Sequence, residues 1–131
     1  MFYAFTITGN GSYENPRVQR ILTKEKNHTQ MSFLKISNMS EERQEKIVAV
    51  YKTLNTAIKN AHKAFIDITK GETCLIFDSY NGIFYDINGN KIATGRWGTS
   101  NVEPDNPKEF WSYVDTQQKR NFEVAKKLGY I

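Results

Sequence analysis

The sequence has little cysteine and only short apolar runs, two features that exclude several classes of protein. It has a single cysteine, Cys74, so it can form no internal disulfide. Its apolar stretches are short, as at residues 74–77, whereas a helix that crosses a bilayer needs about 20 apolar residues. These two shortages exclude a disulfide-stapled secreted fold and predict that the protein does not span a membrane.

The N-terminal segment also lacks what a secretory leader needs. Residues 1–11 (MFYAFTITGNG) contain no basic side chain and no long apolar run, so we expect no signal peptide. Together with the single cysteine, this segment predicts a cytoplasmic protein in a reducing compartment.

Arginine and histidine are scarce as well, although the net charge is +4. Of the 18 basic residues 13 are lysine and 5 are arginine, and there are 2 histidines. Arginine is the planar residue that suits base and phosphate recognition, so this balance permits nucleic-acid binding without favouring it. What is present is globular in composition. With 39% apolar and 24% charged residues, the chain is expected to form a single α+β domain, residues 1–131.

The first third of the chain reads as β-strands. Residues 2–8 (FYAFTIT) are rich in aromatic and β-branched side chains, and they end at a Gly-Asn-Gly turn. We expect further strands over residues 17–24 and 30–36. The polar segment 25–28 between them predicts a hairpin connection.

A long amphipathic helix is predicted over residues 40–70. Apolar or small side chains recur at spacings of 4 and 3 from Ile47 to Ile68, which places them on one stripe of a helix. Ser40 can cap the start of this helix, and Gly71 follows its end. At 1.5 Å per residue the helix would be about 40 Å long and would span the whole sheet.

Three more predicted strands form a meander. They cover residues 72–79, 83–87 and 90–94. The two connections, Asn81-Gly82 and Asn88-Gly89, are dipeptides that tolerate the positive φ angles of tight hairpin turns.

The final helix begins at residues 106–109 (NPKE), which combine a cap, a proline at the first helical position and a glutamate placed to bond back. Its apolar face runs from Phe110 to Leu128, and Gly129 ends it. The resulting order, βββα-βββα, predicts an α+β fold. We expect a six-stranded, mostly antiparallel sheet with both helices packed on one face.

No metal motif is complete in the sequence. Asp86, Asn88 and Asn90 stand at the first three ligand positions of a calcium loop. Lys91 and Trp97 stand where that loop needs a glycine and a bidentate carboxylate. We therefore expect no metal and no cofactor.

No catalytic group is assembled by sequence alone. His28 falls in a polar hairpin and His62 at the edge of the helical stripe, both ordinary positions for a histidine. Asp78 and Asp86 can face each other across a hairpin, although aspartates beside turns are more often structural. Cys74 has no nearby cation to lower its pKa. We expect no enzyme. A small-molecule or nucleotide-binding protein or hydrolase stays an alternative if these groups converge.

Arg96 and Trp97 form the best candidate for a binding site. They begin the polar stretch 95–105, and long ordered loops in small domains often carry function. Tryptophan and arginine are enriched at binding hot spots. Tyr13, in the first loop, is expected beside them at the same end of the sheet. In the other interpretation Trp97 packs over Trp111 and closes the core, with Arg96 at the rim.

Four lysines form a second candidate site. Lys52, Lys59, Lys63 and Lys70 are separated by 7, 4 and 7 residues, which places them on one line of the predicted helix. Such a line can track a phosphate backbone. The ordinary interpretation is a solvated outer face, because no arginine or aromatic residue interleaves with these lysines.

These patterns predict a small, non-catalytic, intracellular binding protein that occupies a macromolecular partner. We expect a protein partner more than a nucleic acid, with Trp97, Arg96 and Tyr13 at the interface. Inhibitors and regulators of this kind are common in phages and mobile elements, and the 13 Lys, 12 Asn and 12 Ile suggest an AT-rich genome. Nucleic-acid binding through the four lysines is the main alternative.

Overall fold

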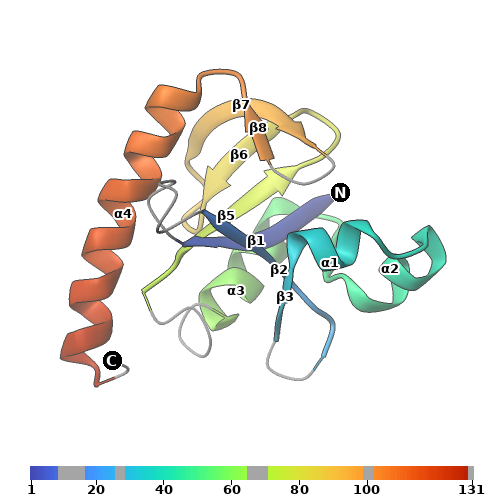
Figure 1. Cartoon of the computed structure of the whole chain (residues 1–131), viewed down its shortest axis with the longest axis horizontal. Coiled ribbons are helices and arrows are strands. Elements are labelled where there is room, and N and C mark those ends of the chain that lie inside the picture. Colours follow the sequence, from blue (N-terminus) through green and yellow to red (C-terminus); the bar gives the residue numbers. More distant parts are fainter. Residues whose placement is uncertain (9–16, 26–28, 65–70, 99–101, 130–131) are drawn as a thin grey trace.

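The chain forms an α+β fold around an antiparallel sheet, as the sequence predicts (Figure 1). This computed structural model describes residues 1–8, 17–25, 29–64, 71–98 and 102–129. Within those ranges it has eight strands and four helices, so the expected six strands and two helices are too few.

The bounds of the elements are as follows. The strands are β1 (Phe2–Thr8), β2 (Val18–Leu22), β3 (Gln30–Ser32), β4 (Val50–Tyr51), β5 (Thr73–Asp78), β6 (Ile83–Asp86), β7 (Lys91–Trp97) and β8 (Val102–Pro104). The helices are α1 (Phe33–Ser37), α2 (Glu41–Ile47), α3 (Leu54–Ala64) and α4 (Pro107–Lys127).

β1 lies at the centre of the sheet and pairs with three strands. The order across the sheet is β3-β2-β1-β5-β6-β7-β8, and β4 pairs with the first two residues of β1. β5 is buried along its whole length, and Leu75 in it lies opposite Phe5 of β1. Strands that are apolar at successive positions need cover on both faces of the sheet.

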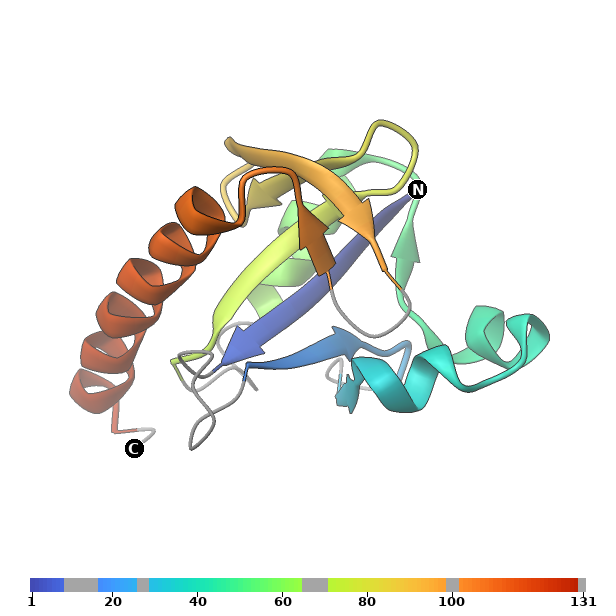
Figure 2. The ribbon, with the colours of Figure 1, turned by 45° about the horizontal axis from the view of Figure 1, so that its top comes forward.

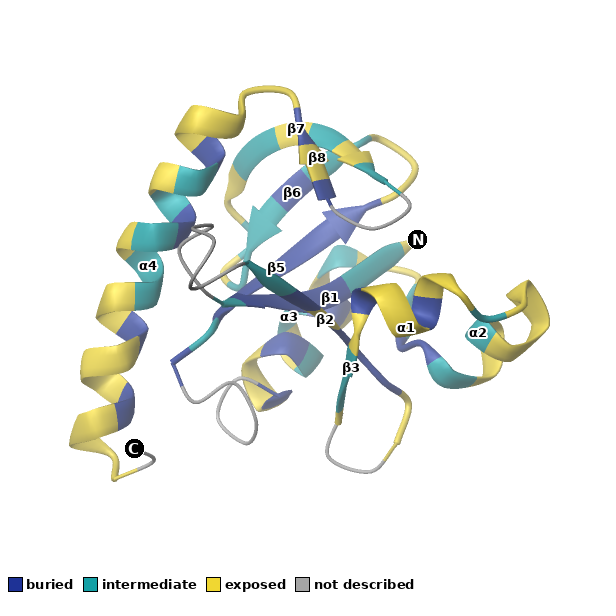
Figure 3. Cartoon of the chain, in the orientation of Figure 1, coloured by how far each residue is buried: buried dark blue, intermediate teal, exposed yellow. Residues whose placement is uncertain are grey.

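The two longer helices supply that cover on opposite faces, so the prediction that both helices pack on one face is wrong. Ala4 and Ile76, which pair across β1 and β5, pack against the buried alanines of α3. Their neighbours Phe5 and Leu75 point to the other face, where Phe110 of α4 covers them. The buried residues of α4 accordingly face the sheet, and its outer side is exposed (Figure 3).

The predicted helix over residues 40–70 is wrong in its middle. α2 ends at Ile47, the chain is then extended, and α3 begins only at Leu54. α3 continues to Ala64, and residues 65–70 lie outside the described part of the chain. The start at the Ser40 cap is confirmed, because the Ser40 side chain accepts a hydrogen bond from the main-chain N–H of Arg43.

Strand pairing interrupts this helix. Val48 forms an antiparallel bridge with Thr23, and Val50 pairs with Tyr3 of β1. β-branched residues fit a pleated surface better than a helix, and here two neighbouring strands offer their main-chain groups. Thr53 then starts α3 afresh, since its hydroxyl accepts a hydrogen bond from the N–H of Thr56 at 3.2 Å.

Two other predicted segments are corrected. The strand expected over residues 30–36 stops at Ser32, and α1 follows because Phe33 and Ile36, three residues apart, are both buried there. The stretch 95–105, expected as a loop, is largely a hairpin in which β7 runs on to Trp97 and β8 pairs with it.

Local signals elsewhere are confirmed. Gly82 and Gly89 have φ angles of 66° and 88°, as the predicted turns require. Asn106 caps α4, and its side chain accepts a hydrogen bond from the N–H of Glu109. No helix within the described ranges is long and apolar enough to cross a membrane.

The sheet curls until its far strands meet. Gln19 of β2 accepts a hydrogen bond of 2.8 Å from the main-chain N–H of Val102 in β8, although the two strands lie near opposite ends of the strand order. Figure 2 shows the hairpin of β7 and β8 folded over the centre of the sheet. This curl brings Trp97, at the end of β7, onto the side chains of β1.

Candidate functional site

Trp97 joins two parts of the hydrophobic core. Its ring contacts four aromatic rings, with centroid separations of 4.8 Å to Phe33, 4.9 Å to Phe5, 5.4 Å to Phe77 and 6.0 Å to Tyr3. Phe5 and Phe77 belong to the core under α4, whereas Phe33 belongs to the core under α1. The ring is therefore held in one orientation by neighbours from two strands, β1 and β5, and from α1.

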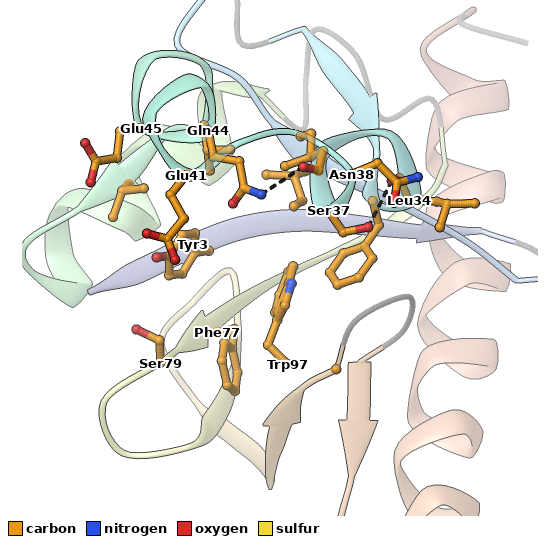
Figure 4. A pocket seen from close by; sticks show the side chains of 16 residues that line it. Tyr3, Leu34, Ser37, Asn38, Glu41, Gln44, Glu45, Phe77, Ser79 and Trp97 are labelled. Atoms are coloured by element: carbon orange, nitrogen blue, oxygen red, sulfur yellow. Dashed lines mark hydrogen bonds between the residues drawn. The ribbon is translucent and has the colours of Figure 1, made fainter.

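A groove opens beside this ring. It has a volume of about 690 Å³ and lies between the α1–α2 segment and the ends of β1, β5 and β7 (Figure 4). Its apolar surface comes from aromatic and aliphatic side chains: Tyr3, Ile21, Phe33, Leu34, Ile36, Val48, Val50, Phe77 and Trp97. Its polar surface comes chiefly from α1, α2 and the turn between them: Ser37, Asn38, Glu41, Gln44, Glu45 and Ser79. Clefts of roughly 300–1,000 Å³ with this mixture are the usual size of ligand sites.

The helical wall of the groove is held in place by hydrogen bonds. Gln44 donates from its side-chain amide to the carbonyl oxygens of Ile36 and Met39, both at 3.0 Å. Ser37 donates to the carbonyl of Leu34 at 2.9 Å. The Gln44 bonds tie α2 to the end of α1, and with the Ser37 bond they hold the wall of the groove in place (Figure 4).

Trp97 lines the groove, and its indole N–H has no hydrogen-bond partner among the described residues. In the described part of the chain, the buried side-chain atoms without a hydrogen-bond partner are Thr6 Oγ1 and Gln118 Oε1. The indole nitrogen of Trp97 is unpaired as well but is not among these buried atoms. The indole nitrogen therefore reaches solvent. Buried tryptophans usually pair this donor, so Trp97 offers a fixed apolar ring with a free polar tip.

Arg96 does not share this site with Trp97. Successive residues of a strand point to opposite faces, and Arg96 forms an ion pair with Glu103 on β8. Its side chain is 79% exposed and does not line the groove. Tyr13, the third predicted interface residue, lies outside the described residues.

Trp97 packs against the core, as one interpretation of the sequence predicted, but its predicted contact with Trp111 is wrong. Trp97 packs on β1, β5 and α1, whereas Trp111 contacts Phe110 and Arg17. The guanidinium of Arg17 lies 4.0 Å from the Trp111 ring centroid and pairs with Asp115, which ties the start of β2 to α4.

The four predicted lysines do not form one helical line. Lys59 and Lys63 are exposed on α3 and line a shallow hollow with Asn55, Thr56 and Asn60. Lys52 is exposed but precedes the helix, and Lys70 lies outside the described residues. Because the predicted long helix is split, Lys52 is separated from Lys59 and Lys63. These two lysines form a pair on α3 in place of the predicted line of four.

The histidine and aspartate candidates do not converge. Asp78 lies opposite Ile83 and Asp86 lies opposite Leu75, so the carboxylates stand at different ends of the β5–β6 ladder. His62 is exposed on α3, and His28 lies outside the described residues. No group of three metal-binding side chains occurs in the part of the chain that the structure describes.

Both aspartates organise turns. Asp78 is 2% exposed and accepts hydrogen bonds from the N–H groups of Tyr80 and Asn81 and from the Asn81 side chain. Burial by itself raises the pKa of Asp78, but the hydrogen bonds from Asn81 and Tyr80 outweigh it, so the pKa lies below its usual value. Asp86 accepts equivalent bonds from the N–H groups of Asn88 and Asn90.

We expect Asp78→Asn to lower the free energy of unfolding by about 1.5–3 kcal/mol near neutral pH, because hydrogen bonds to a charged acceptor are lost. Since the pKa of Asp78 is lower in the folded state, its carboxylate stabilises the fold above the unfolded pKa of about 3.9. That contribution disappears as pH falls through the folded pKa. Urea unfolding of both proteins across the acid range should show the difference shrinking, and a constant difference would contradict this role.

Cys74 is buried beneath α3 and carries no reactive thiolate. Burial, with a smaller effect of the Glu72 carboxylate, raises the pKa of Cys74 to about 12. Burial, together with Cys74, also raises the pKa of Tyr51 to about 12. Both groups are neutral at physiological pH and pack with the core on the α3 face.

The sequence predicted a candidate site at Trp97 but not the other residues that line the groove. The sequence predicted no binding role for Leu34, Glu41 or Glu45, because their segments were assigned to a strand and to a single long helix. Leu34 gave one usable signal: in the sequence FLKIS, it falls between Phe33 and Ile36, so a helix that buries both exposes it. No protein-family model, curated protein or solved structure matches the chain.

Proposed function

We propose that the protein is a binding protein that takes an apolar segment of a partner protein into the Trp97 groove. The observation that carries this proposal is the state of Trp97. Its ring is fixed by four aromatic neighbours, and its indole N–H is left unpaired at an open groove. A rigid aromatic anchor with a free donor is typical of an interface hot spot, because little side-chain freedom is lost on binding.

The distribution of polar and apolar groups favours a protein partner. The groove has aromatic and aliphatic side chains at its floor and carboxylate, amide and hydroxyl groups along its helical side. An apolar centre with a polar rim is the usual anatomy of a protein interface. Leu34 adds to the apolar part, since it is 55% exposed where α1 borders the groove.

The titratable groups of the groove favour binding over chemistry. Among its described lining residues they are Tyr3, Glu41 and Glu45, with no histidine, lysine or cysteine. The hydroxyls of Ser37 and Ser79 donate to main-chain carbonyls and not to a described side-chain base. We therefore propose that the protein acts by occupying its partner, as small phage-type inhibitors do.

Nucleic-acid binding through Lys59 and Lys63 is the second candidate function. Both lysines are exposed on α3, and neither forms an ion pair with a residue in the described ranges. They lie one helical turn apart beside Asn55, Thr56 and Asn60, side chains that also bond phosphate. Two lysines give a weak footprint, so this function takes second place.

Replacing Leu34 with glutamine should reduce capture of the partner, whereas Leu128→Gln should not. Both leucines are exposed helix-end residues, 55% and 60%, but Leu34 borders the groove and Leu128 lies on α4. If Leu34 anchors the partner, its replacement weakens binding by about tenfold or more, whereas most other interface positions matter little. Tagged wild-type and variant proteins are incubated with a lysate of the encoding organism, and captured proteins are quantified by mass spectrometry.

The same capture separates the two candidate functions. Repeating it with nuclease removes partners that are held through DNA or RNA, which the second candidate requires and the first does not. A partner that Leu34→Gln and Leu128→Gln retain equally would contradict the groove as the binding site. Thermal unfolding of both variants checks that neither substitution acts through stability.

A further inference from the structure

We propose that the segment bound in the Trp97 groove is basic as well as apolar, with lysine or arginine side chains facing Glu41 and Glu45. This inference rests on the proposed function, because it names the chemistry of the partner for that groove. Three features of the groove support this inference. They are the sign of its charges, the absence of ion-pair partners for them among the described residues, and the packing of its aromatic rings.

The charge of the groove is opposite to that of the whole chain. The protein has 18 basic and 14 acidic residues and a net charge of +4. Nevertheless, the described residues that line the groove include two carboxylates, Glu41 and Glu45, and no lysine, arginine or histidine. A negative groove on a positive protein attracts a cationic segment and disfavours an acidic one.

The two carboxylates lie on one side of α2. Glu41 and Glu45 are four residues apart, so their Cβ atoms are about 5–6 Å from each other on the helix surface. Both side chains are exposed, and both border the groove (Figure 4). Two cations of a partner that are one helical turn apart, or two positions apart on a strand, match this spacing.

Neither carboxylate is neutralised within the described part of the chain. The ion pair on α2 joins Lys46 to Glu42, at 3.5 Å, and leaves Glu41 and Glu45 out. Lys24 reaches the same helix, but its ammonium donates to the main-chain carbonyl of Glu45 and not to the carboxylate. The partner therefore has two charges to pair with and no existing bond to displace.

The aromatic rings indicate where the apolar part of the segment binds. A cation held by an aromatic cage needs open ring faces, but Trp97 packs within 4.8–6.0 Å of Phe33, Phe5, Phe77 and Tyr3. These rings fill the space between them. We infer that cations bind at the rim beside α2, and that apolar anchors of the same segment contact Trp97 and Leu34.

Selection from a displayed library of random short peptides tests this pairing. Wild-type protein is the target, and peptides eluted by competition are sequenced. We expect the enriched peptides to combine aromatic or large aliphatic residues with lysine or arginine at the stated spacing. Enriched peptides that are neutral or acidic would overturn the inference.

The most enriched peptide is then measured against charge variants. We expect Glu41→Gln/Glu45→Gln to slow association by about three- to tenfold and to flatten its dependence on salt, because rim charges act mainly on the encounter rate. The matched control is Glu42→Gln/Glu123→Gln, which removes the same charge from exposed glutamates paired with Lys46 and Lys126. This control should bind as the wild type does.

The outcomes separate this inference from the proposed function. If Leu34→Gln weakens peptide binding and Glu41→Gln/Glu45→Gln does not, the groove binds a partner but its carboxylates do not select it. If neither change matters, or no peptide is enriched, the proposed function fails as well. Equal effects of the two double variants would show that only net charge is sensed, which also overturns the inference.

Discussion

Replacing Trp97 with alanine is expected to lower the free energy of unfolding by about 3–5 kcal/mol, the usual cost of truncating a packed tryptophan. Trp97 is the residue through which the end of β7 contacts β1, β5 and α1, since its ring touches Tyr3, Phe77 and Phe33. Its loss leaves a cavity between two parts of the core and removes the aromatic contacts of the end of β7 with β1, β5 and α1.

Urea unfolding, followed by circular dichroism, measures this loss. Trp97→Phe should lose less than half as much, because a ring still contacts the three neighbours. Tyr80→Ala is the surface control: Tyr80 is 89% exposed, so its replacement should change stability by less than about 0.5 kcal/mol. A loss below about 1 kcal/mol for Trp97→Ala would mean that the ring does not hold the hairpin in place.

Gly95→Ala is expected to have the second largest effect, a loss of about 3 kcal/mol, at the upper end for overpacking. A Cβ at Gly95 would lie 2.6 Å from the carbonyl oxygen of Glu103, 2.7 Å from the Cα of Pro104 and 2.9 Å from the ring of Phe84. Two of these atoms are main chain, so no side-chain rotation relieves the clash. β8 has to move, and the neighbouring Trp97 moves with it.

Gly129→Ala is the matched control for this substitution. Gly129 has a φ of 78° and no atom within 4 Å of the added carbon, so alanine there incurs only the strain of a left-handed residue, about 1 kcal/mol. We also expect Gly95→Ala, and not Gly129→Ala, to weaken partner binding. Thermal unfolding of both variants compares the two effects, and equal losses would contradict the close approach of β7 and β8.

The parts of the fold that sequence predicts well are those that local chemistry decides. The turns at Gly82 and Gly89 follow from residues that tolerate positive φ, and the start of α4 follows from Asn106 and Pro107. The α+β class and the antiparallel pairing followed from the same signals. Neither the turns nor the start of α4 depends on a distant residue.

The prediction of one long helix failed because the apolar pattern at its centre fits both a helix and a strand. Residues 47–51 (IVAVY) are apolar at every position, which fits a buried strand as well as a continued helical stripe, so the sequence alone does not choose between them. The choice is made by Thr23 and Tyr3, distant residues whose strands pair with Val48 and Val50. The prediction that both helices pack on one face of the sheet failed for a similar reason. It treated the strands as apolar on one face, whereas the central strands are apolar on both.

The same distinction between local sequence and distant contacts applies to the candidate site. Trp97 was identified from residue type, because tryptophan in a polar stretch is unusual. The groove beside it depends on α1 and α2, which the sequence had placed in a strand and in a longer helix. Leu34, Glu41 and Glu45 become neighbours of Trp97 only when the sheet curls and the helix is split. The role of Tyr13 stays a prediction.

The indole N–H signals of Trp97 and Trp111 test the central claim most directly. The chain has these 2 tryptophans, one at the groove and one under Arg17 on α4, so each serves as control for the other. They are followed by NMR while the selected peptide or the captured partner is added. We predict that the Trp97 signal shifts in proportion to binding while the Trp111 signal stays in place. Saturated binding with an unmoved Trp97 signal would contradict the account.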